Sequence, residues 1–188
     1  MTRVGWVVLA GIGLVAALFA SVVRFGAAPA PPQPAKPVLA HNGGLRVPVA
    51  GVARAAVTDT WGQARSEGRQ HHGTDIMAGG GTPVLAVAGG TVEKLFQSRL
   101  GGTTLYERSA DRRWTFYYAH LASYAPGVHE GQKVLPGQLL GFVGDTGDAG
   151  PGNYHLHFSL TRTDPRQKWY EGEDVNPFPY LSRPISLP

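Results

Sequence analysis

The first hydrophobic feature of the chain is one long run without charges. Residues 4–23 carry no charged side chain and are bounded by Arg3 and Arg24. A helix of about 20 residues is roughly 30 Å long, which is the thickness of a bilayer core. The pattern predicts that residues 1–24 form a transmembrane N-terminal membrane anchor, or a signal sequence if the small residues at 26–30 provide a cleavage site.

A proline-rich segment follows this run. Residues 27–37 read AAPAPPQPAKP and contain five prolines. Such a composition favours extended polyproline II and cannot build a hydrophobic core. We therefore expect residues 25–44 to be a Pro/Ala-rich linker that holds the rest of the chain away from the membrane.

From residue 45 onward the pattern changes to short hydrophobic runs separated by glycines. No 12-residue window shows the 3.6-residue periodicity of an amphipathic helix. Runs rich in Val, Leu, Tyr, Phe and Thr predict strands at residues 83–88, 91–97, 103–108, 113–120, 139–143 and 155–161. The predicted fold of residues 45–188 is thus an all-β domain with an antiparallel sheet.

Composition then limits the chemistry of this domain. The chain has no cysteine, so a metal ion would have to be held by histidines and carboxylates. The net charge of +4 is compatible with a nucleic-acid partner. However, three of the 17 basic residues and none of the 13 acidic residues precede residue 45, so most of the excess positive charge lies outside the predicted domain. The remainder is nearly neutral and lacks a basic stripe with interleaved aromatics, so we expect no nucleic-acid partner.

Two short motifs place histidines at spacings that suit a metal ion. In HHGTD, His71 and Asp75 lie four residues apart, and Gly73 between them allows a tight backbone path. In HLHF, His155 and His157 share one face of a predicted strand. HHGTD alone is a weak signal that also fits a polar turn, and HLHF alone also fits a surface pair of histidines, but together they predict a metal site.

A further histidine ends the aromatic run WTFYYAH. Alternation along this predicted strand places Phe116, Tyr118 and His120 on one face. A histidine at the end of an aromatic strand suits a site wall, although this feature alone favours a half-exposed strand end. Catalytic zinc keeps three protein ligands and leaves a fourth position for water. His71, Asp75 and one histidine of HLHF can supply these ligands, which leaves the other one and His120 for proton transfer.

The chain carries a longer ordered series of short motifs. HHGTD is followed by GTPV, GGTV, YAHL, GQKV and GDTG, and the series ends in HLHF. Over residues 45–160 this series resembles the LytM/lysostaphin-type zinc metallopeptidases, peptidase family M23. The resemblance implies an antiparallel sheet with a groove, and a zinc-dependent endopeptidase that hydrolyses peptide cross-links between the peptide stems of bacterial peptidoglycan.

The resemblance also assigns roles to particular residues. It implies one zinc ion per chain, held by His71, Asp75 and His157. It implies a catalytic pair that consists of His120 and His155.

Some positions depart from the family pattern or are variable in it. Tyr154 and Ser159 stand where the family often has Pro and Glu, so we expect a difference in substrate preference. Tyr118, Tyr154 and Ser159 are the candidates for substrate binding. His72 falls on a variable position and is not expected to be a ligand.

One alternative function belongs to another class. Some relatives without metal ligands are cell-wall regulatory or binding modules that activate another murein hydrolase, but the ligand set here is intact. A carrier of the biotinyl or lipoyl type would need a modified lysine at a hairpin tip, and neither Lys94 nor Lys133 stands in such a motif. We expect the domain to face the periplasm or cell wall from an inner-membrane anchor, or to be periplasmic or secreted after signal cleavage.

Overall fold

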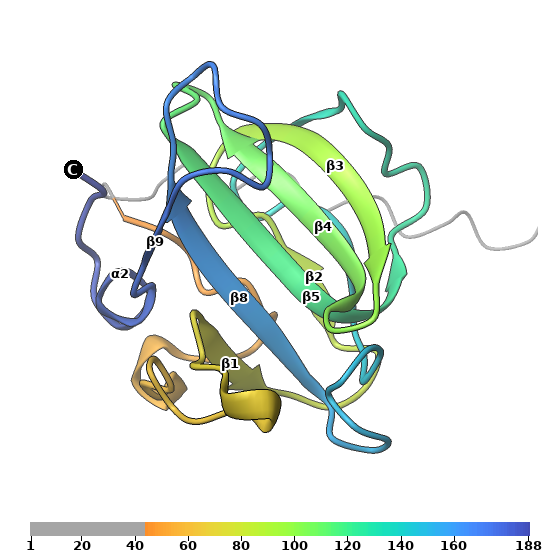
Figure 1. Ribbon diagram of the computed structural model, residues 1–188. Coiled ribbons are helices and arrows are strands. Elements are labelled where there is room, and N and C mark those ends of the chain that lie inside the picture. Colours follow the sequence, from red (N-terminus) through yellow and green to blue (C-terminus); the bar gives the residue numbers. More distant parts are fainter. Residues whose placement is uncertain (1–43) are drawn as a thin grey trace, which may run out of the picture. The chain divides into compact units, whose positions relative to one another are not determined.

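The computed structural model describes residues 44–188, so the predicted anchor at residues 1–24 and nearly all of the predicted linker lie outside the described residues. Within residues 44–188, no helix is long and apolar enough to cross a membrane. The elements of this region (Figure 1) are η1 (Arg54–Ala56), η2 (Ser66–Gly68), β1 (Thr74–Met77), β2 (Pro83–Leu85), β3 (Gly90–Ser98), β4 (Gly102–Ser109), β5 (Trp114–Tyr124), β6 (Lys133–Val134), β7 (Leu139–Val143), β8 (His155–Arg162), β9 (Glu173–Val175) and α2 (Phe178–Ser182).

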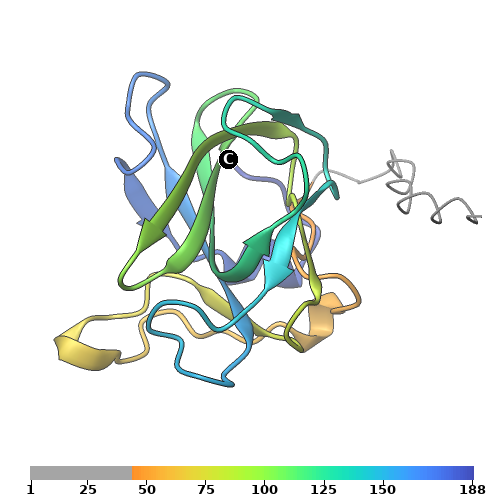
Figure 2. The ribbon, with the colours of Figure 1, turned by 90° about the vertical axis from the view of Figure 1, so that its right-hand side faces the viewer.

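The strands of the described region form one antiparallel sheet. Its hydrogen-bonded order is β1-β8-β5-β4-β3-β6, while β2 pairs with β7, β7 also pairs with the end of β5, and β9 pairs with β8. The long strands β3, β4, β5 and β8 make a curved layer, and the short strands β2, β6 and β7 close over one of its faces (Figures 1 and 2). The predicted antiparallel β fold is confirmed, and each predicted strand is present, the one at residues 139–143 with its predicted ends and the others with shifted ends.

Alternation along β8 separates the core from the site. Leu156, Phe158 and Leu160 are completely buried in the hydrophobic core. His155 and His157, between them, line a groove on the opposite face, as the HLHF pattern predicts. Each buried Leu or Phe contributes roughly 1.5–3 kcal/mol to folding, so the core side chains of HLHF hold its two histidines in place.

The same alternation fails near the end of β5. Phe116 and Tyr118 face the core, so simple alternation would bury His120 among them. Instead the β4–β5 register shifts between Thr103 and Leu105, where β5 contains one extra residue, and His120 adopts a φ of 60°. The prediction that these three β5 residues share a face is therefore wrong, because this β-bulge turns His120 into the groove.

The hydrophobic pattern does not predict β1, β6, β9 or α2. β1 begins inside the polar HHGTD motif and becomes a strand because it pairs with β8 over its whole length. The strand predicted at residues 83–88 ends at Leu85, next to an irregularity in its register with β7. Pairing with a neighbouring strand, rather than local composition, therefore decides that β1 forms and where β2 ends.

One carboxyl group lies inside the core. Glu107 on β4 is completely buried, and its Oε2 accepts a hydrogen bond from Tyr118 Oη at 2.6 Å. Its Oε1 has no hydrogen-bond partner among the described residues. Burial raises the pKa of Glu107 to about 8, although the Tyr118 hydrogen bond opposes this shift, so the carboxyl is largely neutral at pH 7.

We predict that this carboxyl makes the domain less stable as the pH rises from about 4.5 to about 8. The folded state keeps a proton that the unfolded chain releases near pH 4.5. The free energy of unfolding should therefore fall by up to about 1.4 kcal/mol per pH unit in this window. Glu107→Gln keeps the shape but cannot ionise, so urea unfolding across this range should show a flatter dependence for the variant. Parallel curves for the two proteins would contradict the prediction.

Candidate metal centre

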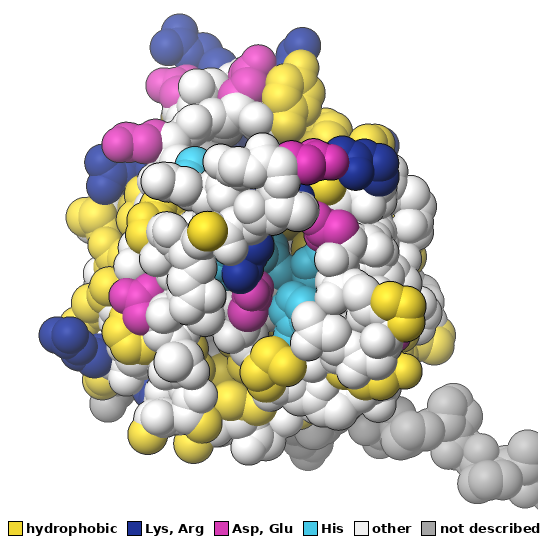
Figure 3. Space-filling model, turned by 60° about the horizontal axis from the view of Figure 1, so that its bottom comes forward, with side chains coloured by type: hydrophobic (Ala, Val, Ile, Leu, Met, Phe, Trp, Pro, Cys, Tyr) yellow, Lys and Arg dark blue, Asp and Glu magenta, His cyan; other side chains and the backbone are white. Residues whose placement is uncertain are grey.

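A groove of about 750 Å³ crosses the face of β5 and β8 that is turned away from the core. Residues 64–66 and 69–72 lie along it on one side, and residues 100–101 and 148–149 also contribute to its lining. The space-filling view looks into this hollow and shows histidines gathered in it beside one acidic and one basic side chain (Figure 3). The groove therefore collects the polar side chains that the motifs single out.

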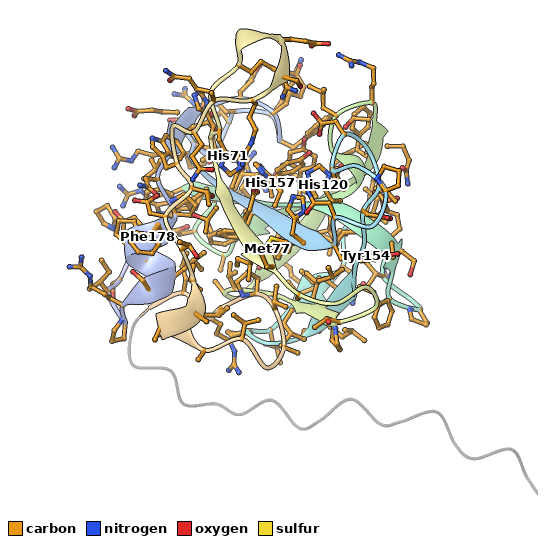
Figure 4. The ribbon with its side chains drawn as sticks, turned by 90° about the horizontal axis from the view of Figure 1, so that it is seen from below. His71, Met77, His120, Tyr154, His157 and Phe178 are labelled. Atoms are coloured by element: carbon orange, nitrogen blue, oxygen red, sulfur yellow. The ribbon has the colours of Figure 1, made fainter. Side chains whose placement is uncertain are left out.

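The three predicted metal ligands meet at one point of the groove. His71 Nε2 lies 2.8 Å from His157 Nδ1 and 3.0 Å from Asp75 Oδ1. His157 Nδ1 lies 3.2 Å from the same carboxylate oxygen. Asp75 on β1 is the direct partner of His157 on β8, and His71 is brought in by the turn before β1 (Figure 4). We call these three residues the triad.

Hydrogen bonds outside the triad set the tautomer of both imidazoles. His71 Nδ1 lies 2.7 Å from the Thr60 carbonyl oxygen, which can only accept, so His71 Nε2 carries a lone pair. Ser159 donates its hydroxyl to the His72 carbonyl, so its oxygen accepts from His157 Nε2 at 2.8 Å. Burial lowers the pKa of His157, and its neutral ring therefore points the lone pair of Nδ1 at the triad.

The triad fits a zinc ion. Two imidazole lone pairs and a carboxylate oxygen converge on one point, which is unfavourable unless a proton or a metal ion lies among them. The three separations of 2.8, 3.0 and 3.2 Å are close to the edge of about 3.3 Å in a tetrahedron with zinc–ligand bonds of about 2.0–2.1 Å. Two nitrogens and one carboxylate oxygen are also the donors that catalytic zinc sites use.

The second oxygen of Asp75 is held from outside the triad. Asp75 Oδ2 accepts a hydrogen bond from the Arg65 guanidinium, and the Asp75 backbone N–H donates to Thr60 Oγ1 at 2.9 Å. Burial raises the pKa of Asp75, but the interactions of its carboxylate with His157 and His71 together outweigh burial and hold the pKa below its ordinary range. Asp75 is thus ionised and presents only Oδ1 to the other two triad residues.

The two predicted catalytic histidines lie beside the triad. His155 Nδ1 is 2.9 Å from the Asn153 carbonyl oxygen, and His120 Nδ1 is 2.8 Å from the Thr146 carbonyl oxygen. Each Nδ1 donates its proton, which leaves each Nε2 free to accept one. His155 Nε2 lies 3.9 Å from Asp75 Oδ1, and the ring centres of His120 and His155 are 4.8 Å apart.

The environment keeps His120 uncharged. Burial lowers the pKa of His120 to about 4, the hydrogen bond to the Thr146 carbonyl opposes this shift, and the ring of His155 adds to it. At neutral pH His120 is therefore a neutral imidazole with a free nitrogen. Such a group can take a proton from a water that enters the groove.

The structure also places His72 and the three residues that the sequence suggests for substrate binding. His72 lines the groove but bonds to Asp174 rather than to the triad, and it is half exposed. Tyr118 is fully buried in the core, so its prediction as a substrate-binding residue is wrong. Tyr154 is 41% exposed and is not among the described residues that line the groove (Figure 4). Ser159 does line the groove, where it contacts His157.

Sequence reasoning misses Arg65, Thr60 and Tyr117. Arg65 and Thr60 belong to a segment without a hydrophobic pattern, and only the folded chain brings them to Asp75 and His71. Tyr117 lines the groove because it alternates with the core residues of β5. The alternation in WTFYYAH could have identified it.

The comparison with protein families decides the identity of this domain. The model of peptidase family M23 matches residues 69–177, which is more than half of the chain. The chain belongs to peptidase family M23. The resemblance carried by the motifs is thereby confirmed, and the triad is the candidate zinc site of this M23 domain.

Similar proteins include enzymes with different named activities. The L-Ala–D-Glu endopeptidase of Bacillus subtilis is 38% identical over 129 residues, which are 65% of this chain and 38% of the relative. The peptidoglycan DD-endopeptidase ShyC of Vibrio cholerae is 37% identical over 93 residues, which are 49% of this chain and 20% of the relative. The M23 chain therefore spans well under half the length of these curated relatives.

A solved structure shows the same fold. The catalytic domain of the antimicrobial peptidase lysostaphin from Staphylococcus simulans is 28% identical to the chain, with a TM-score of 0.57. The alignment covers 68% of this chain and 92% of that domain. The shared part is thus the M23 domain itself.

We predict that His71→Ala removes the metal, whereas His72→Ala retains it. His71 contributes a lone pair to the triad, and the neighbouring His72 is bonded to Asp174 at 3.0 Å instead. Both variants should be loaded with zinc, desalted and analysed for metal content, with circular dichroism as the control for folding. One zinc per chain in both variants would show that His71 is not a ligand.

We predict that Ser159→Ala weakens zinc binding by about 10–100-fold. The variant loses the oxygen that accepts the His157 Nε2 proton and thereby fixes its tautomer. Competition with a chromogenic chelator measures the affinity. Ser66→Ala is the matched control, because Ser66 lines the groove and its hydroxyl bonds to Arg69. An affinity equal to that of the unchanged protein would contradict this role.

Proposed function

We propose that this chain is a zinc-dependent endopeptidase that hydrolyses peptide cross-links of bacterial peptidoglycan. The observation that carries the proposal is a pair of imidazoles, His120 and His155, held through Nδ1 by backbone carbonyls beside a triad that fits zinc. A binding module would need neither feature. Membership of the M23 family and the named activities of the relatives also support a peptidoglycan endopeptidase.

The residues divide the reaction between them. His71, Asp75 and His157 would hold the metal, and a bound zinc ion supplies Lewis-acid polarisation of a water and of the scissile carbonyl. His120 and His155 each present a free Nε2, so either imidazole can take the proton of the attacking water, and the imidazolium that forms can donate to the developing oxyanion. The protonated ring then returns its proton to the leaving amine. The carbonyls of Thr146 and Asn153 hold both rings in orientation throughout.

We also infer where the domain works. The uncharged run at residues 4–23 supports a membrane anchor that leaves the domain facing the periplasm or cell wall, with a cleaved signal sequence as the alternative. The proline-rich linker at residues 25–44 would span the distance to the peptide stems. Both inferences rest on the sequence pattern alone.

We predict that His120→Ala keeps one zinc per chain but lowers hydrolysis by about 10²–10⁴-fold. Purified peptidoglycan should be digested and the fragments followed by mass spectrometry. His129→Ala is the control, since His129 is an exposed turn residue that does not line the groove.

Two results would contradict the proposal. A His120→Ala variant that cuts at the unchanged rate would remove His120 from the mechanism. A zinc-loaded unchanged protein that releases no peptidoglycan fragments would favour the cell-wall binding module instead.

A further inference from the structure

A row of aromatic rings extends the groove beyond the triad. Tyr106, Tyr117, Trp169 and Tyr170 all line it, and we call these four residues the aromatic platform. The ring centres lie 4.6 Å apart for Tyr117–Tyr106, 4.6 Å for Tyr106–Trp169 and 5.0 Å for Trp169–Tyr170. The Tyr117 ring is 5.8 Å from that of His157, so the platform begins at the triad.

Two parts of the fold build this platform. Tyr106 on β4 and Tyr117 on β5 are direct cross-strand partners. Trp169 and Tyr170 come from the connection between β8 and β9, residues 163–172. The completely buried Arg108 holds this connection in place by donating to the Gln167 carbonyl at 3.1 Å and to the Thr163 hydroxyl.

The outer end of the platform lies open to water. Tyr170 is 59% exposed, and the edge of the platform continues to Phe96, which is 40% exposed and packs on Trp169 at 5.4 Å. The amine of Lys168 lies 5.7 Å from the centre of the Tyr170 ring. A row of partly exposed rings that ends in exposed ones and has polar neighbours marks a surface that binds a ligand rather than a core.

The backbone beneath the platform restricts the kind of ligand. Extended peptides bind sheets mainly through hydrogen bonds to an unpaired strand edge. β4 pairs with β3 on one side and with β5 on the other, and β5 also pairs with β8. At Tyr106 and Tyr117 the platform thus offers aromatic side chains but no unpaired strand edge, and this suits a ligand recognised by stacking.

We propose that the aromatic platform is a saccharide subsite that binds the glycan strand of the substrate while the triad cuts its peptide. The C–H faces of pyranose rings stack on Tyr and Trp, and the sugar hydroxyls bond to polar groups at the rim such as Lys168 and Asp174. This inference rests on the proposed function, since a substrate that combines glycan with peptide requires two adjoining subsites. Tyr117 lies where the two subsites meet.

The test measures glycan binding without catalysis. Full-length protein is titrated with peptide-free glycan strands, prepared by removing the stems with an amidase, in the presence of a metal chelator. Calorimetry and Trp fluorescence should report saturable binding. Tyr170→Ala and Trp169→Ala should each weaken the binding about tenfold or more. Leu135→Ala is the matched control, because Leu135 is an exposed apolar residue that does not line the groove.

A kinetic comparison adds a second readout. Tyr170→Ala should raise KM on intact peptidoglycan and leave kcat and KM unchanged on cross-linked peptides that lack sugars. Tyr170 is the sharper variant because its ring is the most exposed of the platform, so its loss leaves the contacts of Trp169 with Tyr106 and Phe96 in place.

The outcomes separate this inference from the proposed function. Loss of glycan binding in Tyr170→Ala supports the subsite even if the protein cuts no peptide bond. Absence of cleavage would contradict only the proposed endopeptidase function, and not the subsite. Unchanged glycan binding in both platform variants would overturn the subsite even if hydrolysis is observed. Weakened binding of sugar-free peptides by Tyr170→Ala would show that the platform is a peptide subsite, and would likewise overturn it.

Discussion

The cross-strand pairing of Asp75 with His157 is the constraint on which the site depends. It joins two motifs that are 82 residues apart in sequence and places their ligand atoms within 3.2 Å. A slip of one residue between β1 and β8 would set Asp75 against Leu156 or Phe158 and turn the histidines to the other face. The burial of those two apolar side chains therefore selects the register that assembles the triad.

A second regularity concerns how the histidines are oriented. Three of the four imidazoles around the triad donate Nδ1–H to a backbone carbonyl, and these carbonyls belong to Thr60, Thr146 and Asn153. All three lie outside the strands. His157 instead presents Nδ1 to the triad and donates through Nε2 to Ser159. The strands therefore place the rings, and the connections choose which nitrogen each ring offers.

This division explains what the sequence can predict. Period-two alternation places the HLHF histidines correctly, because β8 is central and apolar on its other face. It fails for His120 because a bulge in β5 reverses the side on which the ring emerges. Before the bulge the alternation holds, and it places Tyr118 in the core together with Phe116. Arg65 could not be predicted, since its partner Asp75 is reached only through the fold of a polar segment.

The position of His120 depends on the contact between two glycine turns. Gly102 and Gly147 have φ values of 65° and 73°, and a β-carbon on Gly147 would lie 2.2 Å from the Leu100 carbonyl oxygen. Only glycine allows this approach. It brings the Thr146 carbonyl to the His120 ring, while the His120 N–H donates to the carbonyl of the residue before Gly102 at 2.8 Å. The turn at residues 101–103 and the GDTG motif at residues 144–147 thus act on His120 from two sides, and they hold the one catalytic candidate that strand alternation alone would have buried.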